Sequence, residues 1–314
     1  MAEVKKIATR ESYGATLLEL GRLDDKIVVM DADLAGSTKS GVFGKEFPDR
    51  FFNCGIAEQN MIGVAAGLAT MGLKPFVSTF AMFAVCRPYE QIRSLIGYPR
   101  LNVKICASHG GVSVGADGAS HQCCEDFALM RTIPGMLVMC PSDDVEARQM
   151  VKAAYNYDGP VYIRFARAAT PVYHDADYKF EVGKGEIVSD GNDVAIIANG
   201  IVLPEVVKAA AILKAEGISA RVINMGTIKP VDKELVIDSA KACGKIITVE
   251  EHTIIGGLGE AVCSVLAENY PAPVKRIGIN DEFGYSAEAE ELLKAFGLCA
   301  EEISATARAF VNGK

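Results

Sequence analysis

Short apolar runs alternate with helical patterns along almost the whole chain, and this alternation limits the possible folds more than any other feature. The runs predict buried strands at Lys26–Met30, Phe76–Thr79, Val103–Ala107 and Met136–Cys140. Helices are expected between them, at Glu58–Met71, which Gly72 would end, and at Val145–Tyr155, which Ser142-Asp143-Asp144 would cap. Strand–helix alternation of this kind predicts an α/β fold, with a parallel sheet covered by helices on both faces.

A break near residues 168–192 separates two such patterns, because Ser189-Asp190-Gly191-Asn192 and its surroundings are turn residues. The second pattern predicts strands at Val194–Ala198, Ala220–Asn224, Lys245–Val249 and Val274–Ile279, and helices at Leu203–Ala215, Lys233–Ala242, Gly259–Glu268, Ala287–Phe296 and Glu301–Phe310. A chain of 314 residues is expected to form about two domains. We therefore predict one α/β domain over 1–175, a linker over 176–185 and a smaller α/β domain over 186–314.

The charge balance and the cysteines narrow the class of protein. With 32 Lys and Arg against 40 Asp and Glu, the net charge is −8, which is not the footprint of a nucleic-acid binder. No apolar run approaches the ~20 residues that span a bilayer, and the first residues do not form a signal peptide. Nine cysteines, an odd number with irregular spacing, indicate reduced thiols rather than a disulfide scaffold. We expect a cytoplasmic protein without nucleic-acid or membrane partners.

The richest stretch runs from His109 to His121, where four glycines and Asp117 lie between two of the four histidines. It follows a predicted strand, and open α/β sheets bind ligands at the carboxyl ends of their strands. Histidine exchanges protons near neutral pH, so the stretch is a candidate for catalysis or substrate binding. A metal site built from His109, Asp117 and His121, or a plain glycine-rich turn, would also account for the residues.

Three further segments contain candidate functional residues, and a purely structural role would account for each of them equally well. Glu58 begins an almost wholly apolar helix. A carboxylate there either has a functional role or is simply stabilised by the helix dipole at the N-terminus. Phe80 and Phe83 follow a predicted strand and could be core residues or a cofactor platform. The glycines of 256–259 open a helix and could hold an anion or allow tight packing. We assign no function to His174 or His252.

Three motifs together resemble the transketolase family. They are G-I-A-E-Q-N-M (55–61), S-T-F-A-M-F (78–83) and H-x5-G-x-D-G-x-x-H (109–121), in this order. They match the second half of that family's enzymes, the pyrimidine-binding domain followed by the C-terminal domain, over essentially all of the chain. The motifs are specific in combination, although each one alone is weak.

The resemblance implies thiamine diphosphate as cofactor and gives the candidate residues roles. Glu58 would hydrogen-bond the aminopyrimidine, Phe80 and Phe83 would pack on it, and Asp33 would lie near the cofactor. His109, His121 and Asp117 would contact the substrate's oxygens. Arg10, Ser37 and Arg167 would bind its phosphate, and Arg suits this because its planar fork pairs with phosphate oxygens. Cys86 stands where relatives often have Tyr.

The resemblance also implies a partner. The family binds the diphosphate through Mg²⁺ (or Ca²⁺) on a G-D-G…N element that this sequence lacks. We therefore expect the chain to be the C-terminal subunit of a split transketolase, active only with an N-terminal subunit, in an α2β2 assembly that acts on sugar phosphates. Alternatives are half of a deoxyxylulose-phosphate synthase, a 2-oxoacid dehydrogenase β-subunit, or a non-catalytic scaffold paralogue. His109 disfavours the first, because that enzyme generally carries Asp there, and the D-G-x-x-H loop disfavours the second.

Overall fold

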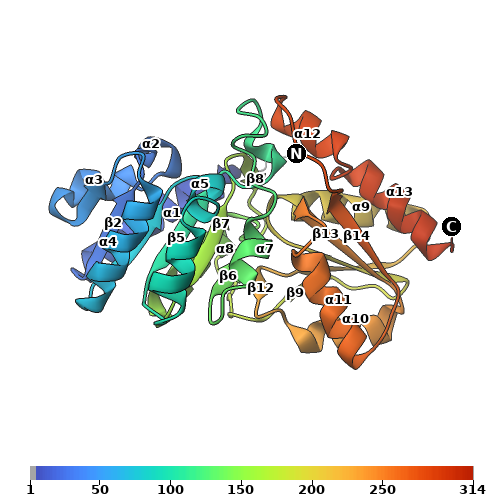
Figure 1. The fold of residues 1–314 in the computed structure, drawn as a ribbon. Helices are drawn as coiled ribbons and strands as arrows, with labels where there is room; N and C mark the ends of the chain where they lie inside the picture. Colours follow the sequence, from blue (N-terminus) through green and yellow to red (C-terminus); the bar gives the residue numbers. More distant parts are fainter. Residues whose placement is uncertain (1–4, 314) are drawn as a thin grey trace.

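The computed structural model describes residues 5–313 and consists of two α/β lobes that lie side by side (Figure 1). The first lobe is built on a seven-stranded sheet, and its strands lie in the order β12-β6-β7-β5-β4-β2-β3. All neighbours pair in parallel except β12, which runs antiparallel to β6 at the edge. The strands are β2 (Ile27–Asp31), β3 (Phe51–Asn53), β4 (Lys74–Ser78), β5 (Lys104–Ser108), β6 (Leu137–Met139), β7 (Val161–Phe165) and β12 (Thr227–Lys229).

Helices cover both faces of this sheet, as the alternating pattern predicts. One core cluster joins the sheet to α4, α5 and α7, and another joins its opposite face to α1 and α8. All five residues of β2, IVVMD, are buried, which is typical of a parallel strand covered on both sides. The helices are α1 (Thr9–Leu23), α2 (Ala35–Thr38), α3 (Gly41–Glu46), α4 (Glu58–Thr70), α5 (Ala81–Val85), α6 (Tyr89–Gln91), α7 (Asp126–Arg131) and α8 (Asp144–Asn156). Shorter helical turns lie at Pro48–Arg50, Ile92–Gly97 and Val112–Val114.

The second lobe has a five-stranded sheet in the order β14-β13-β10-β11-β9, also with helices on both faces. Its strands are β9 (Glu186–Ser189), β10 (Val194–Ala198), β11 (Ala220–Asn224), β13 (Ile246–Thr253) and β14 (Val274–Ile279). Its helices are α9 (Leu203–Ala215), α10 (Lys233–Cys243), α11 (Leu258–Asn269), α12 (Ala289–Ala295) and α13 (Ala300–Val311), with a short turn at Gly200–Val202. Only the edge strand β9 is antiparallel, to β11.

The two lobes share strands and buried ion pairs. β12 comes from the second half of the chain, yet it joins the first sheet. A small ribbon of β1 (Lys6–Ala8) and β8 (Ala169–Pro171) ties the start of the chain to the end of the first lobe. Arg164 on β7 is buried with Asp126 at 3.0 Å and with Glu251 of the second lobe at 3.8 Å. Lone charges at such depth would be costly, so these pairs help to position the lobes.

The predicted elements are confirmed where they are long and apolar. Strands Val194–Ala198, Ala220–Asn224 and Val274–Ile279 and helix Leu203–Ala215 occur with the predicted bounds. Asp143 caps α8 by accepting the Glu146 amide at 2.9 Å, as predicted for this segment. Residues 172–185, which include the predicted linker, form neither helix nor strand.

The glycine turn before α11 does not offer an anion site, because the protein fills it. The carboxylate of Glu250 accepts the amides of Leu258 at 2.7 Å and of Gly259 at 2.8 Å. A side chain at Gly257 would meet Glu250 Oε2 at 2.1 Å. Tight packing, the simpler explanation, therefore accounts for these glycines.

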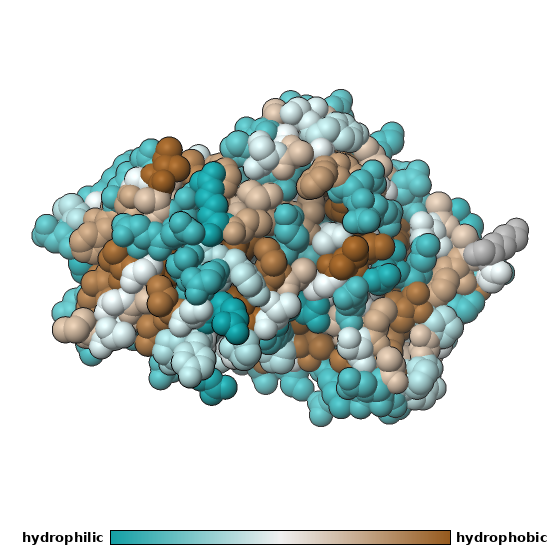
Figure 2. Space-filling model, viewed as in Figure 1, coloured by the Kyte–Doolittle hydropathy of each residue, from teal (hydrophilic) through white to brown (hydrophobic). Residues whose placement is uncertain are grey.

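The surface in Figure 2 shows hydrophobic residues in several separate patches, interspersed with hydrophilic ones over both lobes. Within residues 5–313, no helix combines the length and the apolar character that crossing a bilayer requires.

Candidate functional site

The candidate residues follow three neighbouring parallel strands of the first sheet at the ends where those strands finish. Asp33 comes after β2, Phe80 after β4 and His109 directly after β5. A bridge between Phe80 and Ser108 joins the second and third of these segments. Because the carboxyl ends of parallel strands share one edge, residues distant in the sequence meet there.

His109 lies at the centre of this edge, buried and with a left-handed backbone (φ 59°). Its Nε2 lies 3.3 Å from Arg10 Nη1, its Nδ1 lies 2.8 Å from Ser108 Oγ, and its ring stacks on Phe80 at 3.8 Å between centroids. Since arginine only donates, Nε2 must accept, and the proton of the neutral ring is on Nδ1. Burial and the nearby charges of Arg10, Arg167 and His121 lower the pKa of His109 to about 3. His109 is therefore a neutral acceptor at pH 7.

An aromatic wall extends from His109. Phe80 and Phe83 lie with their ring centroids 6.0 Å apart, and His121 meets the Phe83 ring edge-on at 5.3 Å. His121 Nδ1 is 3.0 Å from Ser120 Oγ. The structure thus brings together both histidines and both phenylalanines that the sequence analysis selected.

Glu58 opens α4 beside this wall and is only 4% exposed. Its Oε1 accepts a hydrogen bond from Arg87 Nη1 at 2.6 Å. The Arg87 guanidinium also lies over the Phe83 ring, 4.2 Å from its centroid. The ion pair with Arg87 offsets the cost of burying this carboxylate.

Sequence reasoning missed Arg87. The signal for it was its position four residues after Phe83, although α5 ends at Val85 and Arg87 lies in the bend that follows. Its partner Glu58 is 29 residues distant in the chain, so the contact itself could not be found from local spacing.

Two arginines line the side of the site next to His109. Arg10 Nη1 donates to the Ser37 carbonyl at 2.9 Å, and Arg167 donates to the Val114 carbonyl. Burial lowers the pKa of Arg10, Glu11 raises it and Arg167 lowers it further, so the two cations act on each other. Arg164, which the sequence could confuse with Arg167, is buried between the lobes instead. Arg10, Ser37 and His109 therefore form one contact group, with the positive charge of Arg167 nearby.

Asp33 and Asp117 lie outside this contact group. Asp33 has a left-handed backbone (φ 65°) and accepts from Asn53 Nδ2 at 3.0 Å, and Asp117 is exposed in the glycine loop. A metal site of His109, Asp117 and His121 does not form, because in residues 5–313 the ligating atoms of only one other trio come close enough together.

Comparisons with known proteins identify two family domains in this chain. The family model described as the transketolase pyrimidine-binding domain matches residues 5–172. The model described as the transketolase C-terminal domain matches residues 183–303. Together they cover most of the chain.

The relatives include both short and long proteins. A Methanocaldococcus jannaschii protein described as a transketolase C-terminal section is 52% identical over 298 residues, covering 94% of this chain and 93% of the relative. A subunit of the apulose-4-phosphate transketolase of Phocaeicola vulgatus is 45% identical, covering 98% of both chains. Human transketolase is 41% identical over 98% of this chain but only 49% of the human enzyme.

The solved structures show the same relationship. A chain described as a split-gene transketolase in an inactive beta4 tetramer superposes with a TM-score of 0.91 at 51% identity, covering 98% of this chain and 99% of that one. This chain therefore belongs to the transketolase family and corresponds to its C-terminal section, the pyrimidine-binding domain followed by the C-terminal domain.

Proposed function

We propose that this chain is the C-terminal subunit of a split, thiamine-diphosphate-dependent transketolase, which transfers a two-carbon ketol unit from a ketose phosphate to an aldose phosphate. The observation that carries the proposal is the meeting of Glu58, the aromatic wall and His109 at one edge of the first sheet. Each of these residue types has a task in this chemistry, and they come from different strands and helices.

The pocket suits an aminopyrimidine ring. Arg87 places a flat group with N–H donors against the Glu58 carboxylate and over the Phe83 ring. An aminopyrimidine is also flat and also carries N–H donors, so the same carboxylate and the same ring can hold it. Bound there, thiamine diphosphate would supply the electron sink that cleavage and formation of the carbon–carbon bond require.

In this proposal, the residues of this chain bind and orient the cofactor and the substrate. Glu58 would accept a hydrogen bond from the aminopyrimidine of the cofactor once Arg87 moves away from its carboxylate. Phe80 and Phe83 would pack on the pyrimidine. Neutral His109 accepts a hydrogen bond from a substrate hydroxyl at Nε2 once Arg10 turns to the phosphate, and His121 faces the same space.

The substrate phosphate is assigned to the positive side of the site. Arg10 and Arg167 supply two cations within an otherwise acidic protein, and Ser37 is already in contact with Arg10. Asp117, exposed in its loop, is assigned to a sugar hydroxyl, and Asp33 to the neighbourhood of the cofactor. Both assignments rest on the motif resemblance.

An N-terminal partner subunit would supply the diphosphate site with its Mg²⁺ (or Ca²⁺), in an α2β2 assembly. The relative named as one subunit of a transketolase and the split-gene tetramer described as inactive support a divided enzyme. The nine free thiols support a cytoplasmic location.

Reconstitution tests the proposal. The purified chain, an N-terminal transketolase subunit, Mg²⁺ and thiamine diphosphate are mixed, and ketol transfer is measured over a panel of ketose and aldose phosphates. We expect transfer by the mixture and none by the chain alone. Glu58→Gln should lower turnover by at least about 100-fold without preventing assembly, since a group acting on protons contributes this much. The control Glu90→Gln, at an exposed carboxylate in the same region, should leave turnover unchanged.

Two results would overturn parts of the proposal. Full transfer by the chain alone would exclude the need for a partner. Unchanged turnover in Glu58→Gln would favour a scaffold role for this chain.

A further inference from the structure

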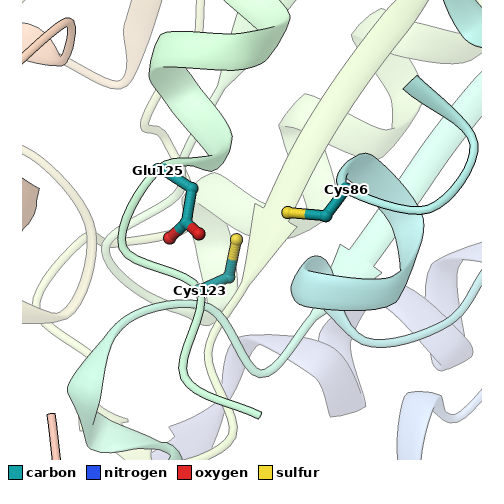
Figure 3. Close-up of side chains that lie close together, drawn as sticks. All are labelled: Cys86, Cys123 and Glu125. Carbon is teal, nitrogen blue, oxygen red and sulfur yellow. The ribbon is translucent and has the colours of Figure 1, made fainter. Parts of the chain in front are cut away.

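Two cysteines and a glutamate converge beside the candidate site although they come from separate segments. Cys86 ends α5, and Cys123 and Glu125 belong to the segment that leads into α7. One ligand atom from each, the two Sγ atoms and a carboxylate oxygen, lie within 4.8 Å of one another. Figure 3 shows the two sulfur atoms pointing toward each other, with the Glu125 carboxylate beside Cys123.

We propose that Cys86, Cys123 and Glu125 form a binding site for a thiophilic divalent cation of the Zn²⁺ class. Zn²⁺ takes sulfur and carboxylate ligands in a tetrahedron, and three protein ligands leave the fourth position to water. Mg²⁺ and Ca²⁺ prefer all-oxygen sites, so two thiolates select against them. The site is separate from the Mg²⁺ assigned to the partner subunit, and it does not depend on the proposed function.

The spacing already approaches that of a bound ion. Zn–S bonds of about 2.3 Å in a tetrahedron place two ligand sulfurs about 3.8 Å apart. The observed separations, up to 4.8 Å, require a contraction of about 1 Å or less, which side-chain rotation can supply.

The carboxylate is held in place and keeps one oxygen available. Glu125 Oε2 accepts the Cys124 amide at 2.7 Å. Its Oε1 has no hydrogen-bond partner among residues 5–313. Fixing one oxygen orients the other, which is how surrounding groups usually prepare a metal ligand.

The three ligands differ in exposure, and Cys86 is the one that solvent reaches. Cys123 is fully buried, Glu125 is half-buried and Cys86 is exposed. The two thiols carry no disulfide, so both sulfurs remain available. Binding would displace their protons, and affinity should therefore rise with pH.

The ligands lie next to the residues of the candidate site, so an ion would act on that site. Cys86 precedes Arg87, which holds Glu58 and covers Phe83. Cys123 follows His121 by two residues, and His121 contacts Phe83. An ion that joins Cys86 to Cys123 would therefore fix the two segments that form the aromatic wall.

Cobalt spectroscopy on the full chain tests the site. The reduced, metal-free protein is titrated with Co²⁺, and the thiolate-to-cobalt charge-transfer band and the visible bands of tetrahedral Co²⁺ are recorded. We expect one ion per chain and displacement by an equimolar amount of Zn²⁺. Cys86→Ser and Glu125→Gln should each weaken binding by about ten-fold or more. Cys299→Ser, a half-buried thiol in the second lobe, is the matched control and should bind as the unaltered chain does.

Hydrogen exchange reports the effect on the pocket. Zn²⁺ should slow amide exchange in α5 and in residues 121–125 of the unaltered chain but not of Cys86→Ser. Because Cys86 is exposed, that variant is expected to fold, which thermal unfolding checks. Absence of a thiolate–cobalt band, an equal band in Cys86→Ser, or unchanged exchange would overturn the proposal. So would a Cys86–Cys123 disulfide found by peptide mapping in a chain that binds no Co²⁺ after reduction.

Discussion

Replacing His174 with glutamine should remove a pH-dependent ion pair that joins the two lobes. His174 Nδ1 lies 3.0 Å from Asp143 Oδ1 in the first lobe, and Nε2 lies 2.8 Å from Glu186 Oε2 on β9 of the second. The imidazole side chain is only 4% exposed and stacks on Tyr178 at 3.8 Å between centroids. Glu146 and Tyr173 also face this ring. With a carboxylate at each nitrogen, the ring is bound most tightly when both nitrogens carry protons.

The size of the effect follows from the pKa of His174. Burial alone would lower it, but the hydrogen bonds to Asp143 and Glu186, with the charge of Glu146, outweigh burial and raise the pKa to about 9. A rise from the usual value near 6.5 corresponds to ~3 kcal/mol of unfolding free energy. The lowered pKa of Asp143 reflects the same contact and is not a second contribution.

The stabilisation decreases as pH rises, because the pKa of His174 is higher in the folded protein than in the unfolded chain. The stabilisation is complete below pH 6.5, decreases as pH rises from 6.5 to 9, and is lost above that. Urea unfolding of the unaltered chain and of His174→Gln, from pH 6 to pH 10, should therefore show a stability difference that shrinks by ~3 kcal/mol. The control Glu234→Gln breaks the exposed pair with Lys184 and should cost less than ~1 kcal/mol.

A direct titration complements the unfolding measurements. The chain has four histidines, so the variant assigns the His174 signal in an NMR titration. A stability difference that does not change with pH, or a His174 ring that titrates near 6.5, would refute the reasoning.

Two further predictions concern the edge of the first sheet. His109 should remain neutral from pH 5 to pH 9 in the same NMR titration. Arg10→Met should raise the pKa of His109, because the Arg10 charge lowers it, and a His109 that titrates near pH 6.5 in the unaltered chain would contradict this. Gly111→Ala should lower the free energy of unfolding in urea by about 1–3 kcal/mol, because the backbone at this position is left-handed (φ 76°) and the new Cβ would lie 2.2 Å from the Glu251 carboxyl carbon. Unchanged stability would show that the loop can shift away from β13.

Long apolar elements could be predicted from the sequence because their buried residues form continuous apolar runs. Strands such as Val194–Ala198 are buried on both faces, so every residue is apolar and the run has clear ends. The edge strands β9 and β12 were not predicted, because each is short and forms only by pairing with a neighbouring strand. For β12 that partner is β6, in the other lobe.

The turn at 256–259 shows how an ambiguous motif is decided. Its glycines alone fit an anion site as well as they fit tight packing. The carboxylate of Glu250, eight residues before Leu258, occupies the amides and settles the choice. Local spacing does not reveal this, because the strand must first bring the carboxylate back to the helix.

The α/β class and the three motifs that mark the transketolase family could be recognised in the sequence, because each depends on residues close together in the chain. Several contacts at and beside the candidate site arise only in the folded protein: Arg87 on Glu58, Arg10 against a neutral His109, and Cys86 beside Cys123. These partners lie 29, 99 and 37 residues apart. Their charge states and distances depend on burial and packing, which exist only once the sheet has brought its strand ends to one edge.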